Sequence, residues 1–110
     1  MKKKKRTDYV LTLNLRGNRR KHNLGTWHLR LSDKMFRLNG QDCVAITDFE
    51  NNDILLYTRQ NLDEIRLSLR HELFHIIENY RDEHILDEEE IVCLQESATA
   101  YADDIIRFLL

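Results

Sequence analysis

The spacing of hydrophobic residues changes once along the chain, close to residue 60. Before that point hydrophobic residues alternate with polar ones, which is typical of strands that bury one face. In the clearest case, Leu11, Leu13 and Leu15 share one face of a segment that ends at Arg16. On this pattern, strands are expected at residues 9–16, 27–32, 35–38, 41–47 and 53–58. Because these segments follow one another closely and Asn39-Gly40 is a strong hairpin signal, we predict an antiparallel sheet meander.

After Asn61, hydrophobic residues recur three or four positions apart, which predicts helices. Asn61 is a candidate N-cap, with Glu64 as its partner three residues later. The first helix is expected over residues 62–79. An acidic run at residues 87–90 suits the start of a second amphipathic helix, because carboxylates are stabilised at a helix N-terminus. The expected fold class is therefore α+β, with the sheet followed by two helices.

The composition fits a single globular domain. The chain has 110 residues, of which 42% are hydrophobic and 33% are charged. We expect this domain to span residues 8–110 and to follow a disordered basic tail over residues 1–7. The net charge of −2 gives no overall bias toward nucleic acid or acidic lipid. Since no segment is apolar enough to cross a membrane, and Cys43 and Cys93 form no disulfide framework, we predict a cytoplasmic protein without membrane association.

The residues His71-Glu72-Leu73-Phe74-His75 match H-E-x-x-H, the pattern of zinc peptidases. Residues four apart lie one above the other on a helix, so His71 and His75 can bind the same metal ion. Both histidines lie outside the apolar stripe of the helix, whereas Glu72 falls on its margin and would reach a water on the metal. The alternative to a metal site is that these are surface residues whose side chains interact with one another four positions apart on the helix. The apolar stripe, the preceding strands and a later helix that carries glutamates favour metal binding.

A catalytic zinc has three protein ligands and one open position, so a third ligand is expected. In the gluzincin class it is a glutamate from the next helix, and Glu96 follows His75 by 21 residues. Glu90, on the opposite edge of that helix's apolar stripe, is the second choice, and His84 and Asp87 rank lower. Alternatively, Glu96 is an ordinary exposed glutamate.

The motif and two preceding segments resemble the minimal metallopeptidases of the ImmA/IrrE type, above all their short relatives encoded by phages and mobile elements. The similarity spans roughly residues 40–110. The residues that carry it are Leu69-Arg70-His71-Glu72-Leu73-Phe74-His75, Val44-Ala45-Ile46-Thr47-Asp48 and Asp53-Ile54-Leu55-Leu56-Tyr57. The resemblance implies a minimal zincin-like fold, in which a small curved sheet leads into the active-site helix and a further helix brings the third ligand.

The same resemblance implies Zn²⁺ bound by His71, His75 and Glu96, with Glu72 as general base. The expected activity is hydrolysis of a peptide bond in a protein substrate, such as a transcriptional repressor, by a metal-activated water. We expect the substrate to add itself as an edge strand along residues 53–58. The candidates for stabilising the oxyanion are Tyr101, His22, His28 and His84.

Two other classes of function stay open. The first is a zinc-binding interaction module without turnover, in which Glu72→Gln would have no functional effect. The second is a nucleic-acid-associated protein that uses Lys2 to Arg6 together with the basic loop at residues 16–22. Its affinity would fall steeply with salt, because binding would depend on contacts with phosphates.

Overall fold

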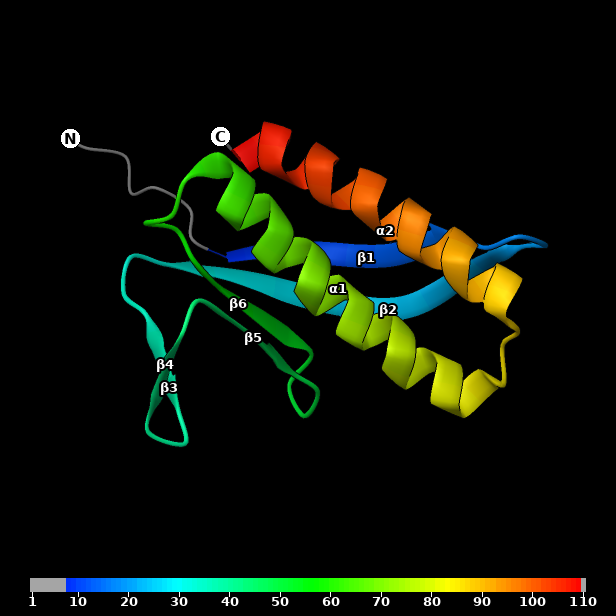
Figure 1. The fold of residues 1–110 in the computed structure, drawn as a ribbon, viewed down its shortest axis with the longest axis horizontal. Helices are drawn as coiled ribbons and strands as arrows, with labels where there is room; N and C mark the ends of the chain where they lie inside the picture. Colours follow the sequence, from blue (N-terminus) through cyan, green and yellow to red (C-terminus); the bar gives the residue numbers. More distant parts are fainter. Residues whose placement is uncertain (1–7, 110) are drawn as a thin grey trace.

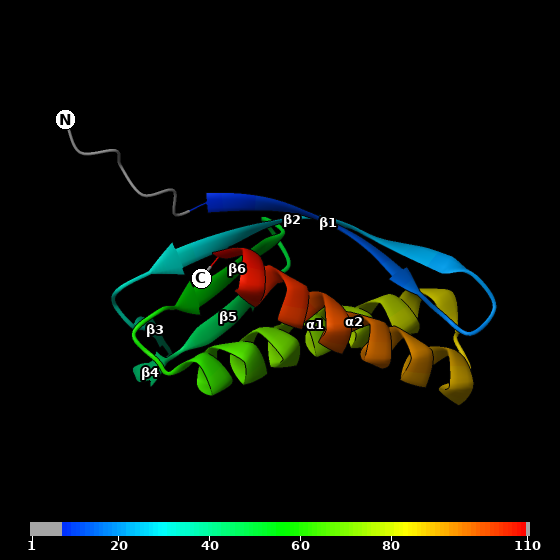
Figure 2. The same ribbon diagram turned by 90° about the horizontal axis from the view of Figure 1, so that it is seen from above.

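The computed structural model describes residues 8–109, which form a four-stranded sheet, a separate two-stranded hairpin and two helices (Figure 1). The basic tail expected at residues 1–7 lies outside the described residues. The expected α+β class, with the sheet first and the helices after it, is confirmed, and both helices cover the same face of the sheet (Figure 2). The elements are β1 (Asp8–Arg16), β2 (Lys21–Ser32), β3 (Phe36–Leu38), β4 (Gln41–Cys43), β5 (Ala45–Asp48), β6 (Asp53–Tyr57), α1 (Leu62–His84) and α2 (Glu88–Leu109).

The strand order of the larger sheet is β1-β2-β6-β5, which differs from a simple meander. The pairs β1–β2 and β5–β6 are antiparallel as expected, but β6 lies parallel to β2, with Leu29 opposite Ile54 and Leu31 opposite Leu56. The strand expected over residues 41–47 divides at Val44, because β4 pairs with β3 whereas β5 pairs with β6. The β3–β4 hairpin therefore stands apart from the larger sheet, next to β5 (Figure 1).

The hydrophobic core lies between one face of the sheet and the facing sides of both helices. In β1 the expected alternation is confirmed: Leu11, Leu13 and Leu15 are buried, whereas Val10 and Thr12 are exposed. Burying a leucine fully stabilises the fold by roughly 1.5–3 kcal/mol relative to leaving it exposed. The largest fully buried side chains come from both layers: Leu13, Leu15, Leu29, Ile54, Leu56, Leu69, Leu73, Ile77 and Leu94. This packing fixes the position of α1 against the sheet.

Helix α1 is defined by a cap at each end. The Asn61 side chain accepts a hydrogen bond from the Glu64 backbone N–H at 2.9 Å, and its amide donates to the Glu64 carboxylate, so the expected capping pair is confirmed. The helix continues past its expected end at residue 79 and reaches His84. It stops at Ile85, which adopts the left-handed conformation (φ 49°) and donates its N–H to the Arg81 carbonyl oxygen at 2.9 Å. The link to α2 is consequently short. Within residues 8–109, neither helix contains a segment long and apolar enough to cross a bilayer.

Candidate metal centre

The two motif histidines lie together on the flank of α1. The Nε2 atoms of His71 and His75 are 2.9 Å apart, and both side chains are exposed, while Leu69 and Leu73 of the same helix are buried against the sheet. Two imidazoles on a tetrahedral zinc, with bonds of 2.0–2.1 Å, hold their nitrogens roughly 3.3 Å apart. The observed separation therefore needs only a small side-chain adjustment to chelate an ion. In the absence of an ion it also suits a hydrogen bond between the two rings, with one nitrogen as donor.

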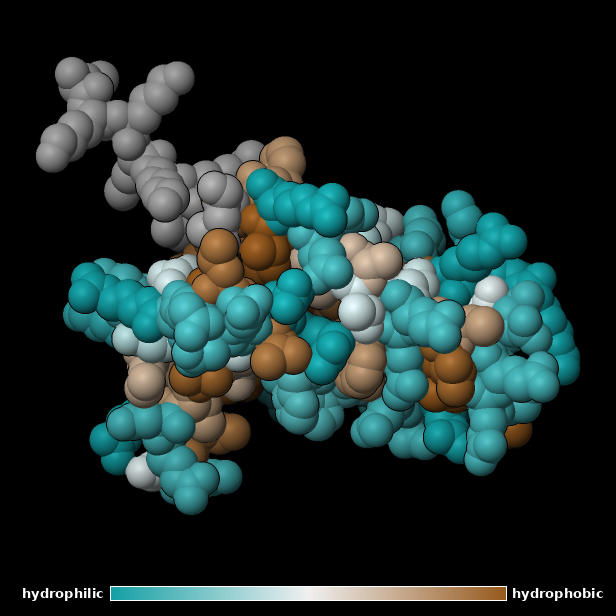
Figure 3. All heavy atoms as spheres, turned by 45° about the horizontal axis from the view of Figure 1, so that its top comes forward, coloured by the Kyte–Doolittle hydropathy of each residue, from teal (hydrophilic) through white to brown (hydrophobic). Residues whose placement is uncertain are grey.

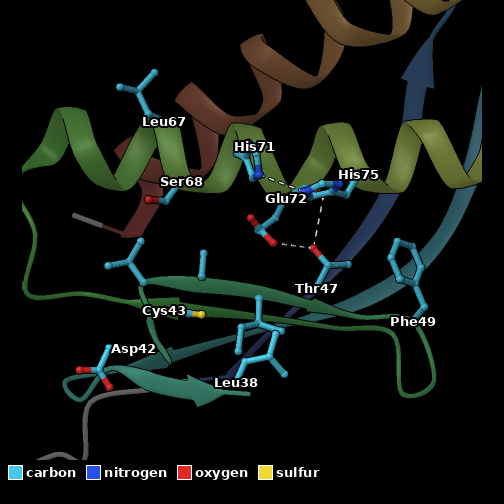
Figure 4. Close-up of a pocket in the computed structure, with 13 residues that line it drawn as sticks. Leu38, Asp42, Cys43, Thr47, Phe49, Leu67, Ser68, His71, Glu72 and His75 are labelled. Atoms are coloured by element: carbon cyan, nitrogen blue, oxygen red, sulfur yellow. Dashed lines mark hydrogen bonds between the residues drawn. The ribbon is translucent and has the colours of Figure 1, made fainter. Parts of the chain in front are cut away.

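Glu72 lies beneath the two histidines, in the space between α1 and β5 (Figure 4). Its side chain is buried, with 6% of the residue exposed, as its place on the margin of the apolar stripe predicts. The Thr47 hydroxyl donates to Glu72 Oε1 at 3.1 Å and lies 3.5 Å from the Glu72 carbonyl oxygen. A buried carboxylate needs such a donor, because removal from water without a partner is costly. Thr47 thus fixes the direction of the carboxylate.

These three residues form a compact group of potential metal ligands. One ligand atom from each of His71, Glu72 and His75 lies within 4.8 Å of the others. Within residues 8–109, no other histidine, cysteine, aspartate or glutamate joins this group, and no second group of this kind occurs. The group opens into a hollow of about 770 Å³ between α1 and the segment that carries β4 and β5. Two imidazoles with a carboxylate beside them suit Zn²⁺ and a water on it, so the residues fit the ion that the motif implies.

The structure does not bring Glu96, the expected third ligand, to the two histidines. Glu96 is exposed and lines a different hollow, together with Arg16 and Asn18 of the β1–β2 hairpin. The neighbouring Ser97 shows which way this side of α2 faces, because its hydroxyl accepts a hydrogen bond from the Arg16 backbone N–H at 3.0 Å. That side of α2 therefore contacts β1. A role for Glu96 as a ligand therefore stays a prediction that the arrangement does not support.

Glu90, the second choice, is committed to another buried cluster. Its Oε1 accepts a hydrogen bond from His22 Nε2 at 2.6 Å, and its Oε2 accepts from the backbone N–H groups of Asn18 and Arg19 at 3.1 and 3.2 Å. The other nitrogen of His22 lies 2.8 Å from the Tyr80 hydroxyl. The hydrogen bond from His22 lowers the pKa of Glu90, an effect that desolvation opposes and the backbone donors reinforce. This carboxylate holds the β1–β2 hairpin against α2.

The basic loop of the β1–β2 hairpin faces the acidic start of α2. Arg19 forms an ion pair with Asp87 at 2.9 Å, and the Asn18 side chain donates to Glu89 at 3.2 Å. Asp87, ranked low as a ligand, also caps α2, because its side chain accepts a hydrogen bond from the Glu90 N–H at 2.9 Å. The basic loop and the acidic run thus contact each other within the molecule.

None of the four candidates for oxyanion stabilisation lines the hollow at the motif. His22 is buried in the cluster with Glu90, and His84, which also ranked low as a ligand, places its Nδ1 2.9 Å from the Tyr80 carbonyl oxygen. His28 of β2 lies beside Asp8 of β1, with 3.6 Å between its Nδ1 and Asp8 Oδ1. Tyr101 lines a separate hollow between β1 and α2, where burial raises the pKa of its hydroxyl. These four expectations gain no support from the geometry.

The strand next to the motif is β5, and this corrects the expected substrate edge at residues 53–58. Strand β6 is paired on both sides, with β2 and with β5, so it presents no free edge. Its two buried residues, Ile54 and Leu56, suit an interior strand. Strand β5 is instead the last in the order of the described sheet, and its Thr47 reaches the motif. Thr47 was missed by sequence reasoning, because only the pairing of β5 with β6 shows that it faces α1.

The chain matches no protein-family model, no curated protein and no solved structure. The resemblance to the ImmA/IrrE type therefore rests on the residues that carry it, of which the structure supports the His71, Glu72 and His75 group in an α+β fold.

Proposed function

We propose that this protein is a zinc-dependent peptidase of the minimal zincin type, acting on a peptide bond in a protein substrate. The observation that carries the proposal is the joint geometry of three side chains. His71 and His75 place their Nε2 atoms 2.9 Å apart at the surface, and the buried carboxylate of Glu72 lies directly beneath them. Surface residues paired by chance would not require one member to be a buried acid with its own hydroxyl donor.

When bound by His71 and His75, zinc supplies a Lewis acid that polarises a carbonyl and makes a water more acidic. Glu72 then acts as general base: its carboxylate accepts a proton from the attacking water and later passes it to the leaving amine. Thr47 holds Glu72 in position for both transfers, since its hydroxyl donates to Oε1. The substrate binds extended along β5, whose outer side is unpaired within the described sheet.

A second candidate function, a metal-binding interaction module without turnover, is favoured by one observation. Within residues 8–109, only two histidines and the candidate base gather at the site, whereas a catalytic zinc usually has three protein ligands. In such a module the motif would hold a metal, or stabilise α1 through it, and Glu72 would have no chemical role. The nucleic-acid alternative has less support, because Arg19 of the basic loop is paired with Asp87.

The proposal is tested by metal content and cleavage measured on the same preparations. Zinc is quantified in protein purified without added metal, for wild type, His75→Ala, Glu96→Ala and the control His84→Ala, which removes an exposed histidine of α1 away from the site. We expect about one zinc per chain in wild type and in His84→Ala, and loss in His75→Ala. Loss in Glu96→Ala as well would show that α2 rearranges to supply the third ligand. Absence of zinc from wild type after reconstitution would overturn the proposal.

Cleavage is then followed by mass spectrometry on a mixture of peptides prepared from unfolded proteins. The peptidase proposal requires that wild type cleaves and that Glu72→Gln retains zinc but loses cleavage by at least roughly a hundredfold, because the general base is gone. If wild type binds zinc but cleaves no peptide, and Glu72→Gln binds the same amount of zinc, the interaction module would be supported instead.

A further inference from the structure

The hollow at the motif gathers exposed hydrophobic side chains. Single exposed hydrophobic residues are normal on a protein surface, but several around one hollow mark a binding site. Among the described residues, ten large hydrophobic side chains are exposed, and four of these line this hollow. They are Leu38 (50% exposed), Val44 (37%), Phe49 (43%) and Leu67 (47%). In the space-filling view, hydrophobic surface occurs where the β3–β4 hairpin joins the rest of the molecule, among mostly hydrophilic neighbours (Figure 3).

These four residues come from different elements and flank the motif on two sides. Leu67 precedes His71 by one helical turn on α1, and Val44 directly precedes β5. Phe49 directly follows β5, so it lies at the other end of that strand, as Figure 4 shows. Its ring packs edge-on against the buried Trp27, with 5.6 Å between the ring centroids, so this end of the hollow is preformed.

The charges around the hollow also restrict what it binds. Its titratable lining residues, the two motif histidines and Cys43 aside, are Asp42 and Glu72, and it has no lysine or arginine among the described residues. No basic side chain of this lining is therefore available to pair with an acidic side chain of a peptide. Away from the motif, the exposed side chains that a peptide would meet are mainly apolar.

We infer that the hollow selects an extended peptide segment with large apolar side chains on both sides of the bond at the motif. Residues in a strand advance by about 3.3 Å, so the distance from Val44 to Phe49 along β5 is about 16 Å. A peptide beside β5 reaches both apolar ends of the hollow with residues about four or five positions apart. As a preference for substrate, this inference rests on the proposed function; as a binding preference, it is tested separately.

Binding is measured by fluorescence anisotropy with zinc-loaded Glu72→Gln protein, which holds a peptide without cleaving it. The probes are two labelled peptides with the same Gly-, Ser- and Thr-rich host sequence. One carries Leu and Phe at the central positions, and the other carries Ser and Asn there. We expect the apolar peptide to bind at least about tenfold more tightly, since burying one large apolar side chain corresponds to roughly that factor.

Two leucines of α1 provide a matched pair of variants. Leu67→Lys places a cation inside the hollow, whereas Leu62→Lys makes the same change at a residue that is 60% exposed and outside it. Since both positions are exposed, neither change disturbs the core. Leu67→Lys is expected to abolish the preference for the apolar peptide, and Leu62→Lys to leave its affinity within about twofold.

Wild type is tested for cleavage of the same two peptides, so that the two proposals fail separately. The inference is overturned if both peptides bind with equal affinity, or if both lysine variants lose affinity for the apolar peptide equally. Equal cleavage of both peptides overturns it too, but leaves the peptidase proposal standing. Selective binding of the apolar peptide, lost in Leu67→Lys and accompanied by no cleavage in wild type, supports the apolar hollow and overturns the peptidase proposal.

Discussion

The hydroxyl of Thr47 lies 3.1 Å from Oε1 of Glu72, so the edge strand β5 directly contacts the only buried acid of the motif. These two residues come from different layers of the fold, one from the sheet and one from α1. In the proposed function, the strand that binds the substrate is therefore also the strand that orients the general base. Correct orientation of the carboxylate is a condition for proton transfer to and from the water.

Replacing Thr47 by valine keeps the side-chain shape and removes the hydroxyl donor. We expect kcat on the apolar peptide to fall by roughly tenfold or more, because a hydrogen bond to a charged group is lost, while zinc content and KM stay close to wild type. Thr47→Ser, which restores a hydroxyl, is expected to recover most of the activity. A similar fall in both variants would mean that Thr47 acts through packing of β5 instead of through Glu72.

Zinc binding is expected to stabilise the folded chain, because an unfolded chain does not hold His71 and His75 together. At a free zinc concentration about 100 times Kd, the free energy of unfolding rises by about 2.7 kcal/mol. Urea unfolding of wild type with zinc and with a chelator measures this difference. His71→Ala should abolish it, and His84→Ala should leave it unchanged. A zinc effect that survives in His71→Ala would place the ion elsewhere.

The Glu90 cluster predicts how stability depends on pH. The hydrogen bond from His22 lowers the pKa of Glu90 in the folded protein below the ordinary value of 4.5. A carboxylate with a lowered pKa stabilises the fold above that ordinary value, and the contribution is lost as the pH falls through the folded pKa. We therefore expect the urea midpoint of wild type to drop as the pH decreases below about 4.5.

Glu90→Gln tests this source of the pH dependence. The variant should be less stable than wild type at neutral pH, and its stability should change less between neutral and acidic pH. Glu88→Gln, the same substitution at an exposed position in the same turn of α2, is the control and should keep the wild-type pH dependence. If the stability of Glu90→Gln changes with pH as much as that of wild type, other carboxylates are responsible for the acid sensitivity.

Gly17 is required where the β1–β2 hairpin approaches the same cluster. A Cβ at this position would lie 1.9 Å from Glu90 Oε1 and 2.9 Å from His22 Cδ2. The Glu90 carboxylate cannot simply move away, because it is held by His22 and two backbone donors. We expect Gly17→Ala to lower the free energy of unfolding by about 1–3 kcal/mol. The effect should shrink in a Glu90→Ala background, since the nearest clashing atoms, those of the carboxylate, are then absent, and a double-mutant cycle of urea midpoints measures this coupling.

Much of the local structure could be predicted from spacing alone. The alternation of Leu11, Leu13 and Leu15 predicted β1 correctly, and the Asn61–Glu64 pair marked the start of α1. The four-residue spacing of His71 and His75 placed both rings on one flank of that helix. These features depend on residues close in sequence, whose relative positions follow from strand and helix geometry.

The expectations that differ from the structure, or that gain no support from it, concern contacts between residues distant in sequence. The pattern of Ile54 and Leu56 fits an edge strand and an interior strand equally well, and only the parallel pairing with β2 makes β6 interior. Glu96 lies beside the apolar stripe of α2, but the sequence does not show which edge of that stripe faces α1. The hydrogen bond from Arg16 to Ser97 assigns the Glu96 side to β1. Neither the pairing of β6 with β2 nor the rotation of α2 about its axis is encoded in residues that are close in sequence.

The burial of Glu72 means that folding and catalysis compete at this position. An acid that is only 6% exposed between α1 and β5 stabilises the fold less than a hydrophobic residue would, because removing a carboxylate from water costs free energy. A version of this chain optimised only for thermal stability would carry a hydrophobic residue at position 72 and would lack the general base of the proposed reaction. A screen for more heat-resistant variants of this protein would therefore favour substitutions of Glu72 that remove the proposed activity.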